Sequence, residues 1–153
     1  MNSQDARLLD VEARDQISEV RAKYSWFIIR GMNDDIADLF TENGVFEYPL
    51  VGTDGKRHLV EGREAIRKHF MNRDPAARVP IIANEIVEIN GNEAKGTCLM
   101  FTPFSPTRAA GIGGYYHERF ACEAGRWRFT ERRYYLYWPV FERPPASIAS
   151  RSD

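Results

Sequence analysis

The chain has 153 residues, close to the ~100–150 residues of a typical globular domain. It is 43% hydrophobic, 28% charged and 12% aromatic, and this composition excludes disordered, collagen-like and low-complexity proteins. Lys and Arg number 21 against 22 Asp and Glu, so the chain lacks the basic field with which proteins bind nucleic acid. We expect a single domain over residues 1–153, with a core at about 11–138, a surface tail at 139–153 and no nucleic-acid partner.

No apolar run approaches the ~20 residues of a membrane span, and the first residues lack the basic and apolar regions of a signal peptide. The sequence therefore predicts a cytoplasmic protein without a membrane partner. Its two cysteines, Cys98 and Cys122, have no CxxC spacing and no cluster of Cys or His around them. We expect buried, inert thiols rather than a zinc site or a disulfide.

Three helices are predicted in the first half of the chain. Apolar residues recur at steps of three and four along residues 11–30, and charged residues that include Arg21 are assigned to the solvent side of this helix. Asp34 is a candidate N-cap of a short helix that ends near 43–44, and residues 62–70 are typical of a third helix. The side chains expected on the apolar faces of the first two helices are Ile17, Val20, Tyr24, Phe27, Ile28, Ile36, Leu39 and Phe40, and Ala65, Ile66, His69 and Phe70 lie near one face of the third.

The later part of the chain alternates in the manner of strands. A short strand at 45–48 and a turn at 53–56 are followed by long strands at 79–89, 94–104, 115–123 and 126–137. Asn90-Gly91 and Ala124-Gly125 are typical hairpin turns, and Gly111 to Gly114 belongs to the connection between the two hairpins.

This order of elements predicts an α+β fold in which a cone-shaped, curved and mostly antiparallel sheet wraps on three N-terminal helices. The concave face of such a sheet, closed by the first helix, would form a pocket lined by apolar and aromatic side chains. That composition is usual for small-molecule sites.

Five motifs occur in order along residues 13–138, namely Ile17-x-x-Val20-x-x-x-Tyr24 and the segments 34–46, 62–66, 84–94 and 125–129. Together they resemble the SnoaL-like branch of the nuclear transport factor 2-like superfamily, which includes scytalone dehydratase-like relatives. The resemblance implies a cystatin-like cone of curved sheet and three helices. It does not imply one reaction, because this fold hosts dehydratases, isomerases, polyketide cyclases, epoxide hydrolases and plain binding proteins.

The resemblance also implies an Asp/His pair, which carries the proton transfer in the dehydratase-like relatives. The position of the Asp is occupied by Ile29, and the position of the His by Pro80. Neither side chain can carry a proton, so the pair is missing. Asp34 and Asp35 lie near enough in sequence to replace the Asp, or they are an N-cap and its solvated neighbour.

His117 and Glu118 are consecutive in one predicted strand, so their side chains lie on opposite faces of the sheet. If His117 faces the cone, its imidazole is a candidate general base at neutral pH. If Glu118 faces the cone, a desolvated carboxylate could do the same work. The other residue then lies on the outer or dimer-facing side.

Two further residues are candidate polarising groups. Tyr48 could donate a hydrogen bond to an oxyanion, or its ring belongs to the core. Arg132 has the guanidinium that pairs a substrate carboxylate or enolate. Alternation from Trp127 assigns Arg133 and Tyr135 to the same face as Trp127, and Arg132 to the opposite face. Mixed Arg and Tyr faces are also typical of dimer interfaces.

The sequence is interpreted first as a cofactor-independent enzyme that acts on a small apolar or aromatic molecule by acid–base proton transfer, as an isomerase, cyclase or dehydratase. Its catalytic residues would be His117, Tyr48 and Arg132. The expected substrate-binding residues are Tyr24, Phe27, Ile28, Phe46, Met100, Glu118 and Tyr135. One alternative is a non-catalytic small-molecule-binding protein, which the missing Asp/His pair favours. A second is a small structural subunit of an oxygenase.

No metal or other cofactor is expected. His58 and His69 are assigned to a turn and a helix, without ligand partners at helical spacing. The glycines at 111–114 do not form a dinucleotide-binding motif. The expected partner besides the small molecule is a second copy of the chain. A strand with arginine and tyrosine on both faces is expected to bury its outer face against another protein surface.

Overall fold

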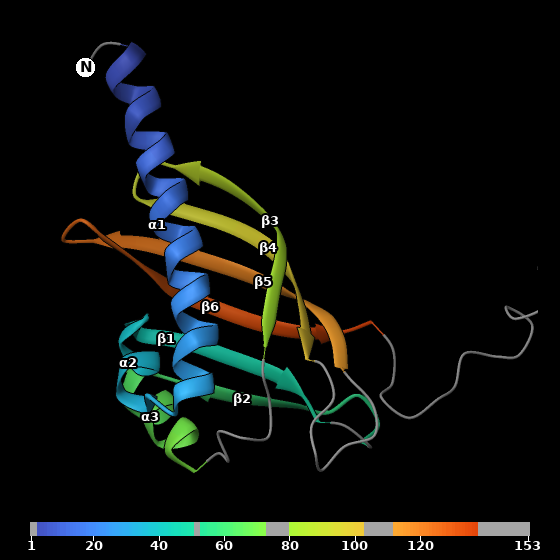
Figure 1. Cartoon of the computed structure of the whole chain (residues 1–153). Coiled ribbons are helices and arrows are strands. Elements are labelled where there is room, and N and C mark those ends of the chain that lie inside the picture. The colour runs from blue at the N-terminus through green and yellow to red at the C-terminus, as the bar shows by residue number, and fades with distance from the viewer. Residues whose placement is uncertain (1–2, 51–52, 73–79, 103–111, 138–153) are drawn as a thin grey trace, which may run out of the picture.

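The computed structural model describes residues 3–50, 53–72, 80–102 and 112–137. Within these ranges the elements are α1 (Ser3–Arg30), α2 (Asn33–Asp38), β1 (Phe40–Pro49), β2 (Arg57–Glu61), α3 (Arg63–Met71), β3 (Ile81–Asn90), β4 (Glu93–Thr102), β5 (Ile112–Glu123) and β6 (Arg126–Leu136). The strands form one curved, open sheet in the order β2-β1-β6-β5-β4-β3 (Figure 1). β1 and β6 run parallel, and the other neighbouring pairs are antiparallel. The predicted α+β class and the mostly antiparallel sheet are confirmed.

The helices cover one face of this sheet, here called the inner face. α1 crosses the sheet, and α2 and α3 lie at the end next to β1 and β2 (Figure 1). α1 begins at Ser3 rather than at residue 11. Leu8, Leu9 and Val11 are all exposed. The apolar periodicity therefore starts late because the first turns of α1 extend beyond the sheet and bury nothing against it.

The second helix is shorter than predicted, and Asp34 is not its N-cap. Met32 occupies the N-cap position, and no side chain caps this end of α2. The carboxylate of Asp34 lies in the first turn and accepts a hydrogen bond from Arg67 on α3. This contact ties α2 to α3 and explains why an acidic residue stands at that position.

The first strand begins five residues earlier than predicted. Phe40 is fully buried, as expected, but it is the first residue of β1 and pairs with Phe129 on β6. The backbone N–H of Phe129 donates to the carbonyl oxygen of Leu39 at 2.8 Å. Sheet pairing therefore ends the helix at Asp38, before the Asn43-Gly44 stop that the sequence indicates.

Two stretches predicted as turn or connection are strands. Residues 57–61 form the edge strand β2, so His58 lies in a strand and not in a turn. β5 begins at Ile112, so Gly113 and Gly114 are strand residues. A Cβ on Gly114 would clash with the carbonyl oxygen of Tyr135, so close packing of β5 on β6 excludes a larger side chain there. The role of Gly114 is thus to let β5 and β6 pack closely, and not to form a turn.

β6 contains a bulge that reverses its alternation. Arg119 pairs with Glu131, whereas the next residue of β5, Phe120, pairs with Phe129, so Thr130 is the extra residue on β6. After Thr130 the other set of side chains points to the helices. The prediction that Trp127 and Arg133 share a face is therefore wrong. Arg132 joins Trp127 and Phe129 on the inner face.

The core lies between the inner face and the three helices. Its buried aromatic side chains are Tyr24, Phe40, Phe46, Phe70, Tyr116, Phe120, Trp127, Phe129 and Tyr134. No helix in the described ranges has the length and the apolar composition that crossing a membrane requires. The predicted tail at 139–153 lies outside the described residues.

Candidate functional site

The most unusual side chain of the inner face is Arg132, which is 0% exposed. Its guanidinium carbon lies 3.9 Å from the ring centroid of Tyr116, 4.0 Å from that of Tyr24 and 4.5 Å from that of Phe129. A desolvated cation over such rings gains about 2 kcal/mol or more. None of its three side-chain nitrogens has a hydrogen-bond partner among the described residues. The site therefore contains a buried guanidinium that makes an ion pair with Glu118 at 3.4 Å but no hydrogen bond to any described residue.

Glu118 is the nearest counter-ion. It pairs with Arg132 across β5 and β6 and is 2% exposed. One carboxylate oxygen, Oε2, lies 2.7 Å from both Nε and Nη2 of Arg21 on α1. The other, Oε1, is 3.4 Å from Nη1 of Arg132 and accepts a weak hydrogen bond from Sγ of Cys98 at 3.6 Å. Both oxygens of Glu118 are thus committed to buried partners.

Arg21 joins this pair to β3. Its Nη1 lies 3.1 Å from Oε2 of Glu85, and its Nη2 donates to the carbonyl oxygen of Ile86 at 3.3 Å. A register shift in β3 between Ala83 and Ile86 puts one extra residue opposite β4 and accompanies this contact. The sequence prediction that Arg21 lies on the solvent side of the first helix is wrong, because its charge is neutralised inside by carboxylates from two strands.

Burial and charge set the protonation of the groups around Arg132. Burial acts to lower the pKa of Arg132, but Glu118, Tyr116, Cys98 and Tyr24 together outweigh burial and raise that pKa, so the guanidinium stays charged. Burial raises the pKa of the Cys98 thiol to about 12. Burial also raises the pKa of Tyr116 well above its usual range. This part of the interior holds a fixed cation among neutral thiol and phenol groups.

Most residues predicted to contact substrate do lie in the interior. The buried ones are Tyr24, Ile28, Phe46, Met100, Glu118 and Arg132. The ring of Phe46 is 6.4 Å from that of Tyr24, so the aromatic surface continues from Arg132 toward β1. Phe27 is half-buried and faces a groove outside this cluster.

Two predicted site residues lie on the opposite, outer face of the sheet. His117 is exposed, and its ring packs edge-to-face on Tyr115 at 5.1 Å and on Tyr135 at 5.2 Å. Of the two alternatives at this strand, the structure therefore places Glu118 inside and His117 outside. His117 as a base inside the cone, and Tyr135 as an interior contact, have no geometric basis. His117 instead lines a surface hollow of about 340 Å³ with Thr97.

The two positions at which the resemblance implies an Asp/His pair lie in different surroundings. Ile29 is exposed on α1, and Pro80 is buried just before β3. Asp34 and Asp35 are both exposed on α2 and do not reach Arg132. No group of three or more His, Cys, Asp or Glu side chains in the described ranges could hold a metal ion.

A second cluster lies where β1, β2 and α3 meet. Tyr48 on β1 pairs with His58 on β2, and their ring centroids are 5.2 Å apart. His69 on α3 lies 5.5 Å from each of them. Tyr48 also contacts the buried ring of Phe46 at 5.6 Å, so this ring cluster continues the aromatic surface of the interior. The sequence missed it because β2 was not recognised as a strand.

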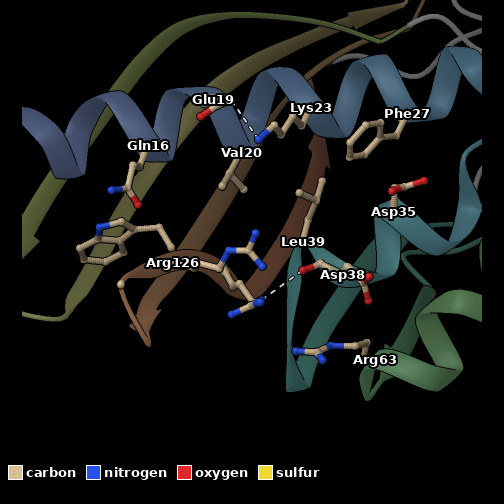
Figure 2. Close-up of a pocket in the computed structure, with 13 residues that line it drawn as sticks. Gln16, Glu19, Val20, Lys23, Phe27, Asp35, Asp38, Leu39, Arg63 and Arg126 are labelled. Carbon is tan, nitrogen blue, oxygen red and sulfur yellow. Dashed lines mark hydrogen bonds and ion pairs between the residues drawn. The ribbon is translucent and has the colours of Figure 1, made fainter.

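A groove of about 520 Å³ lies outside the interior, between α1, α2 and the turn that joins β5 to β6 (Figure 2). Its apolar floor contains Val20, Leu39 and Trp127, and charged side chains of both signs form its rim. Lys23 forms an ion pair with Glu19 at 2.9 Å, which is drawn as a dashed line in Figure 2. Because its rim charges alternate in sign, this groove shows no preference for one class of ligand.

The fold and this interior define a class: a curved, open sheet closed by three helices around an aromatic cluster that contains a buried cation. The sequence matches the family model of the SnoaL-like domain over residues 9–133, and the chain belongs to this family.

Three solved structures share the fold. A protein of unknown function from Mycobacterium tuberculosis is 22% identical, with a TM-score of 0.72 over 97% of this chain and 81% of that one. An NTF2-like protein with a cystatin-like fold from Novosphingobium aromaticivorans is 21% identical, with a TM-score of 0.70 over 95% and 93%. A protein from the same organism, named "Putative Scytalone Dehydratase", is 17% identical, with a TM-score of 0.68 over 92% and 93%. The search among curated proteins found no match.

Proposed function

We propose that this protein binds a small aromatic or apolar molecule on its inner face, and that Arg132 receives a hydrogen-bond acceptor of that molecule. The observation that carries the proposal is the state of Arg132: fully buried, in contact with the rings of Tyr24 and Tyr116, and without a hydrogen-bond partner for its three nitrogens among the described residues. Buried polar groups are almost always hydrogen-bonded, because an unused donor costs about 1–3 kcal/mol. A ligand oxygen at Arg132 would remove that cost.

The same geometry favours binding over the chemistry of the dehydratase-like relatives. The family proton carriers are replaced by Ile29 and Pro80. The interior carboxylate of Glu118 has both oxygens engaged by Arg21, Arg132 and Cys98. The interior cluster can therefore orient a ligand, but it offers no free carboxylate to take a proton.

The ligand class follows from the surroundings of Arg132. The rings of Tyr24 and Tyr116 are inclined to each other by 77° and cover adjacent sides of the guanidinium, and the edge of a guanidinium matches the two oxygens of a carboxylate. Phe46 and Phe129 extend the apolar surface around it. Carboxylate, enolate or phenolate oxygens on a planar apolar body suit this arrangement best.

The test is a matched set of probes: 1-naphthoate, 1-naphthol and naphthalene, with affinities measured by calorimetry. We expect 1-naphthoate to bind most tightly. A charge-assisted hydrogen bond contributes about 1.5–3 kcal/mol, so Arg132→Met should weaken 1-naphthoate binding by roughly 10–100-fold. Arg133→Met is the matched control, since Arg133 lies next in sequence but makes its ion pairs with Glu47 and Glu131 on the outer face.

The control variant should bind 1-naphthoate as the parent protein does. Far-UV circular dichroism and thermal unfolding would establish that both arginine variants are folded. The proposal fails if no probe binds, or if Arg132→Met and Arg133→Met bind 1-naphthoate with the same affinity.

A further inference from the structure

Two buried arginines from different elements share one carboxylate, and they share it unequally. Arg21 on α1, Arg132 on β6 and Glu118 between them are each at most 2% exposed. Nε and Nη2 of Arg21 both lie 2.7 Å from Oε2 of Glu118. Nη1 of Arg132 lies 3.4 Å from Oε1 and makes no hydrogen bond to it. We propose that Arg21 is a positioning residue, which holds Glu118 away from Arg132 and thereby leaves the nitrogens of Arg132 to an anionic ligand.

Arg21 is itself held by the protein. Its Nη1 lies 3.1 Å from Oε2 of Glu85, and its Nη2 donates to the carbonyl oxygen of Ile86 at 3.3 Å. Its guanidinium carbon lies 5.4 Å from the ring centroid of Phe120. A planar guanidinium with several fixed acceptors has one favoured orientation. All three of its nitrogens contact acceptors of the protein, so any effect of Arg21 on a ligand passes through Glu118.

A glycine on β4 makes room for this guanidinium. Gly96 pairs with Glu118 across β4 and β5. A Cβ on Gly96 would lie 2.6 Å from Nη2 of Arg21 and 2.5 Å from the carbonyl oxygen of Ile86, distances that real Cβ contacts do not show. The strand thus leaves beside Glu118 a space that the guanidinium of Arg21 fills.

The charges around Glu118 leave the interior one negative charge short. Two guanidiniums lie there, and among the described residues Glu118 is the one buried carboxylate. Glu85 meets Arg21 from β3, but its side chain is 29% exposed and does not reach Arg132. A buried cation without a full counter-ion is costly. An anion at Arg132 would supply the missing charge, and to that extent the inference rests on the proposed function.

Removal of Arg21 would release Glu118 to Arg132. The two residues lie directly opposite each other on β5 and β6, and Oε1 is already 3.4 Å from Nη1. A small rotation of the carboxylate is therefore enough to form a hydrogen-bonded ion pair. The protein's own carboxylate would then occupy the donors that a ligand anion uses.

The experiment compares 1-naphthoate with naphthalene, which has no oxygen, by calorimetry. Arg21→Met should weaken binding of 1-naphthoate by roughly 10–100-fold, the value of a lost charge-assisted hydrogen bond, and leave naphthalene within about 3-fold. A merely structural role of Arg21 would weaken both probes alike. Arg14→Met is the matched control and should leave both affinities unchanged. Arg14 also joins α1 to β3, by a hydrogen bond to the carbonyl oxygen of Val87 at 2.8 Å, but it is exposed and pairs with Asp10.

A second substitution tests whether Arg21 acts through Glu118. In a double variant that combines Arg21→Met with Glu118→Leu, no carboxylate is left to occupy Arg132. We expect this double variant to bind 1-naphthoate within about 5-fold of the parent protein, so that the second substitution restores what the first removed. Double-variant affinity as low as that of Arg21→Met would overturn the inference. Far-UV circular dichroism would show whether the double variant is folded.

Arg21→Lys decides the question if the double variant does not fold. A lysine at this position keeps a cation for Oε2 of Glu118, so Arg21→Lys should bind 1-naphthoate more tightly than Arg21→Met does. Equal affinities of these two variants would count against the role of Arg21. A crystal structure of Arg21→Met gives a readout without any ligand, because Glu118 should then lie within hydrogen-bond distance of Arg132.

The outcomes separate this inference from the proposed function. If 1-naphthoate binds the parent protein and Arg21→Met with the same affinity, Arg21 is not a positioning residue and the proposed function stands. Equal weakening of 1-naphthoate and naphthalene also overturns the inference, as does a structure of Arg21→Met in which Oε1 of Glu118 stays 3.4 Å from Arg132. If 1-naphthoate does not bind the parent protein, the proposed function fails and this inference fails with it.

Discussion

The two faces of β6 place consecutive arginines in opposite surroundings. On the outer face, Arg133 contacts carboxylates of Glu47 and Glu131, and the hydrogen bond that Arg133 donates to Glu47 raises the pKa of Arg133. On the inner face, Arg132 touches aromatic rings and shares a single carboxylate, that of Glu118, with Arg21. The same residue type is thus stabilised by paired charges near solvent on one face, and by rings on the other.

This difference shows which charges matter for the fold and which for a ligand. A partly exposed ion pair contributes about 0–1 kcal/mol, because water solvates either charge almost as well as its partner does. A buried charge has no such alternative, and loss of its counter-ion costs several kcal/mol. The inner face therefore combines a strict requirement for Glu118 with unused donors on Arg132.

The largest effect should come from removing the interior counter-ion. Glu118→Gln keeps the volume of the side chain but leaves Arg21 and Arg132 buried without their shared carboxylate. We expect the free energy of unfolding to fall by about 3–5 kcal/mol. Urea denaturation followed by tryptophan fluorescence measures it. The outer-face match, Glu131→Gln, should cost about 1 kcal/mol or less. Equal losses in the two variants would contradict the contrast between the faces.

The outer face offers a second contrast, because its aromatic side chains are uncovered. The rings of Tyr115 and Tyr135 stack at 5.3 Å with an interplanar angle of 14°, and Tyr137 beside them is 56% exposed. We predict that two chains associate through this face. Light scattering at micromolar concentration should then give twice the 17.6 kDa mass of one chain.

Tyr137→Glu places a charge in that aromatic patch and should weaken the dimer by roughly 30-fold or more, as substitution of an interface hot spot does. Trp26→Glu is the matched control, since Trp26 is equally exposed but lies on α1. A parent protein that scatters as a single chain would refute the dimer, as would equal dissociation of the two variants.

The sequence was sufficient to predict the elements whose pattern reflects local burial. The stripe of α1, the hairpin after β3 and the four long strands follow from apolar spacing and turn residues, and all are present. Local spacing could not predict that Arg21 is buried, because its partner Glu118 is 97 residues away in the chain. Position 21 does lie on the apolar stripe, between Ile17 and Tyr24, and this is the signal that was available.

Other features depended on a single residue that no pattern reveals. The extra residue at Thr130 reverses the alternation of β6, so the assignment of Arg132 to the inside is correct although the faces deduced from Trp127 are wrong. β2 has one buried residue, Val60, and an edge strand with so little buried surface leaves no clear period. Without β2, the meeting of His58 with Tyr48 and His69 could not be foreseen.

The smallest predicted effect tests the paired charges of the outer face by pH. Burial acts to raise the pKa of Glu47, but hydrogen bonds from Arg133 and Arg57 outweigh it and hold that pKa below its usual value of 4.5. A carboxyl whose pKa is lower in the folded state stabilises the fold above the unfolded pKa and loses this contribution as pH falls through the folded pKa. The stability supplied by Glu47 should therefore be present above pH 4.5 and disappear below it.

Glu47→Gln should consequently cost about 1 kcal/mol or less at neutral pH and flatten the decline in stability below pH 4.5. Urea midpoints measured across that range would show it. Glu61→Gln is the control, because Glu61 is exposed on β2. This substitution should leave the loss of stability at acid pH as it is in the parent protein. If Glu47→Gln loses stability with acid as steeply as the parent protein does, the arginines of the outer face do not depend on Glu47. Arg132 keeps its charge beside a single buried carboxylate. The number of carboxylates near each arginine would then not explain why Arg132 and Arg133 are stabilised differently.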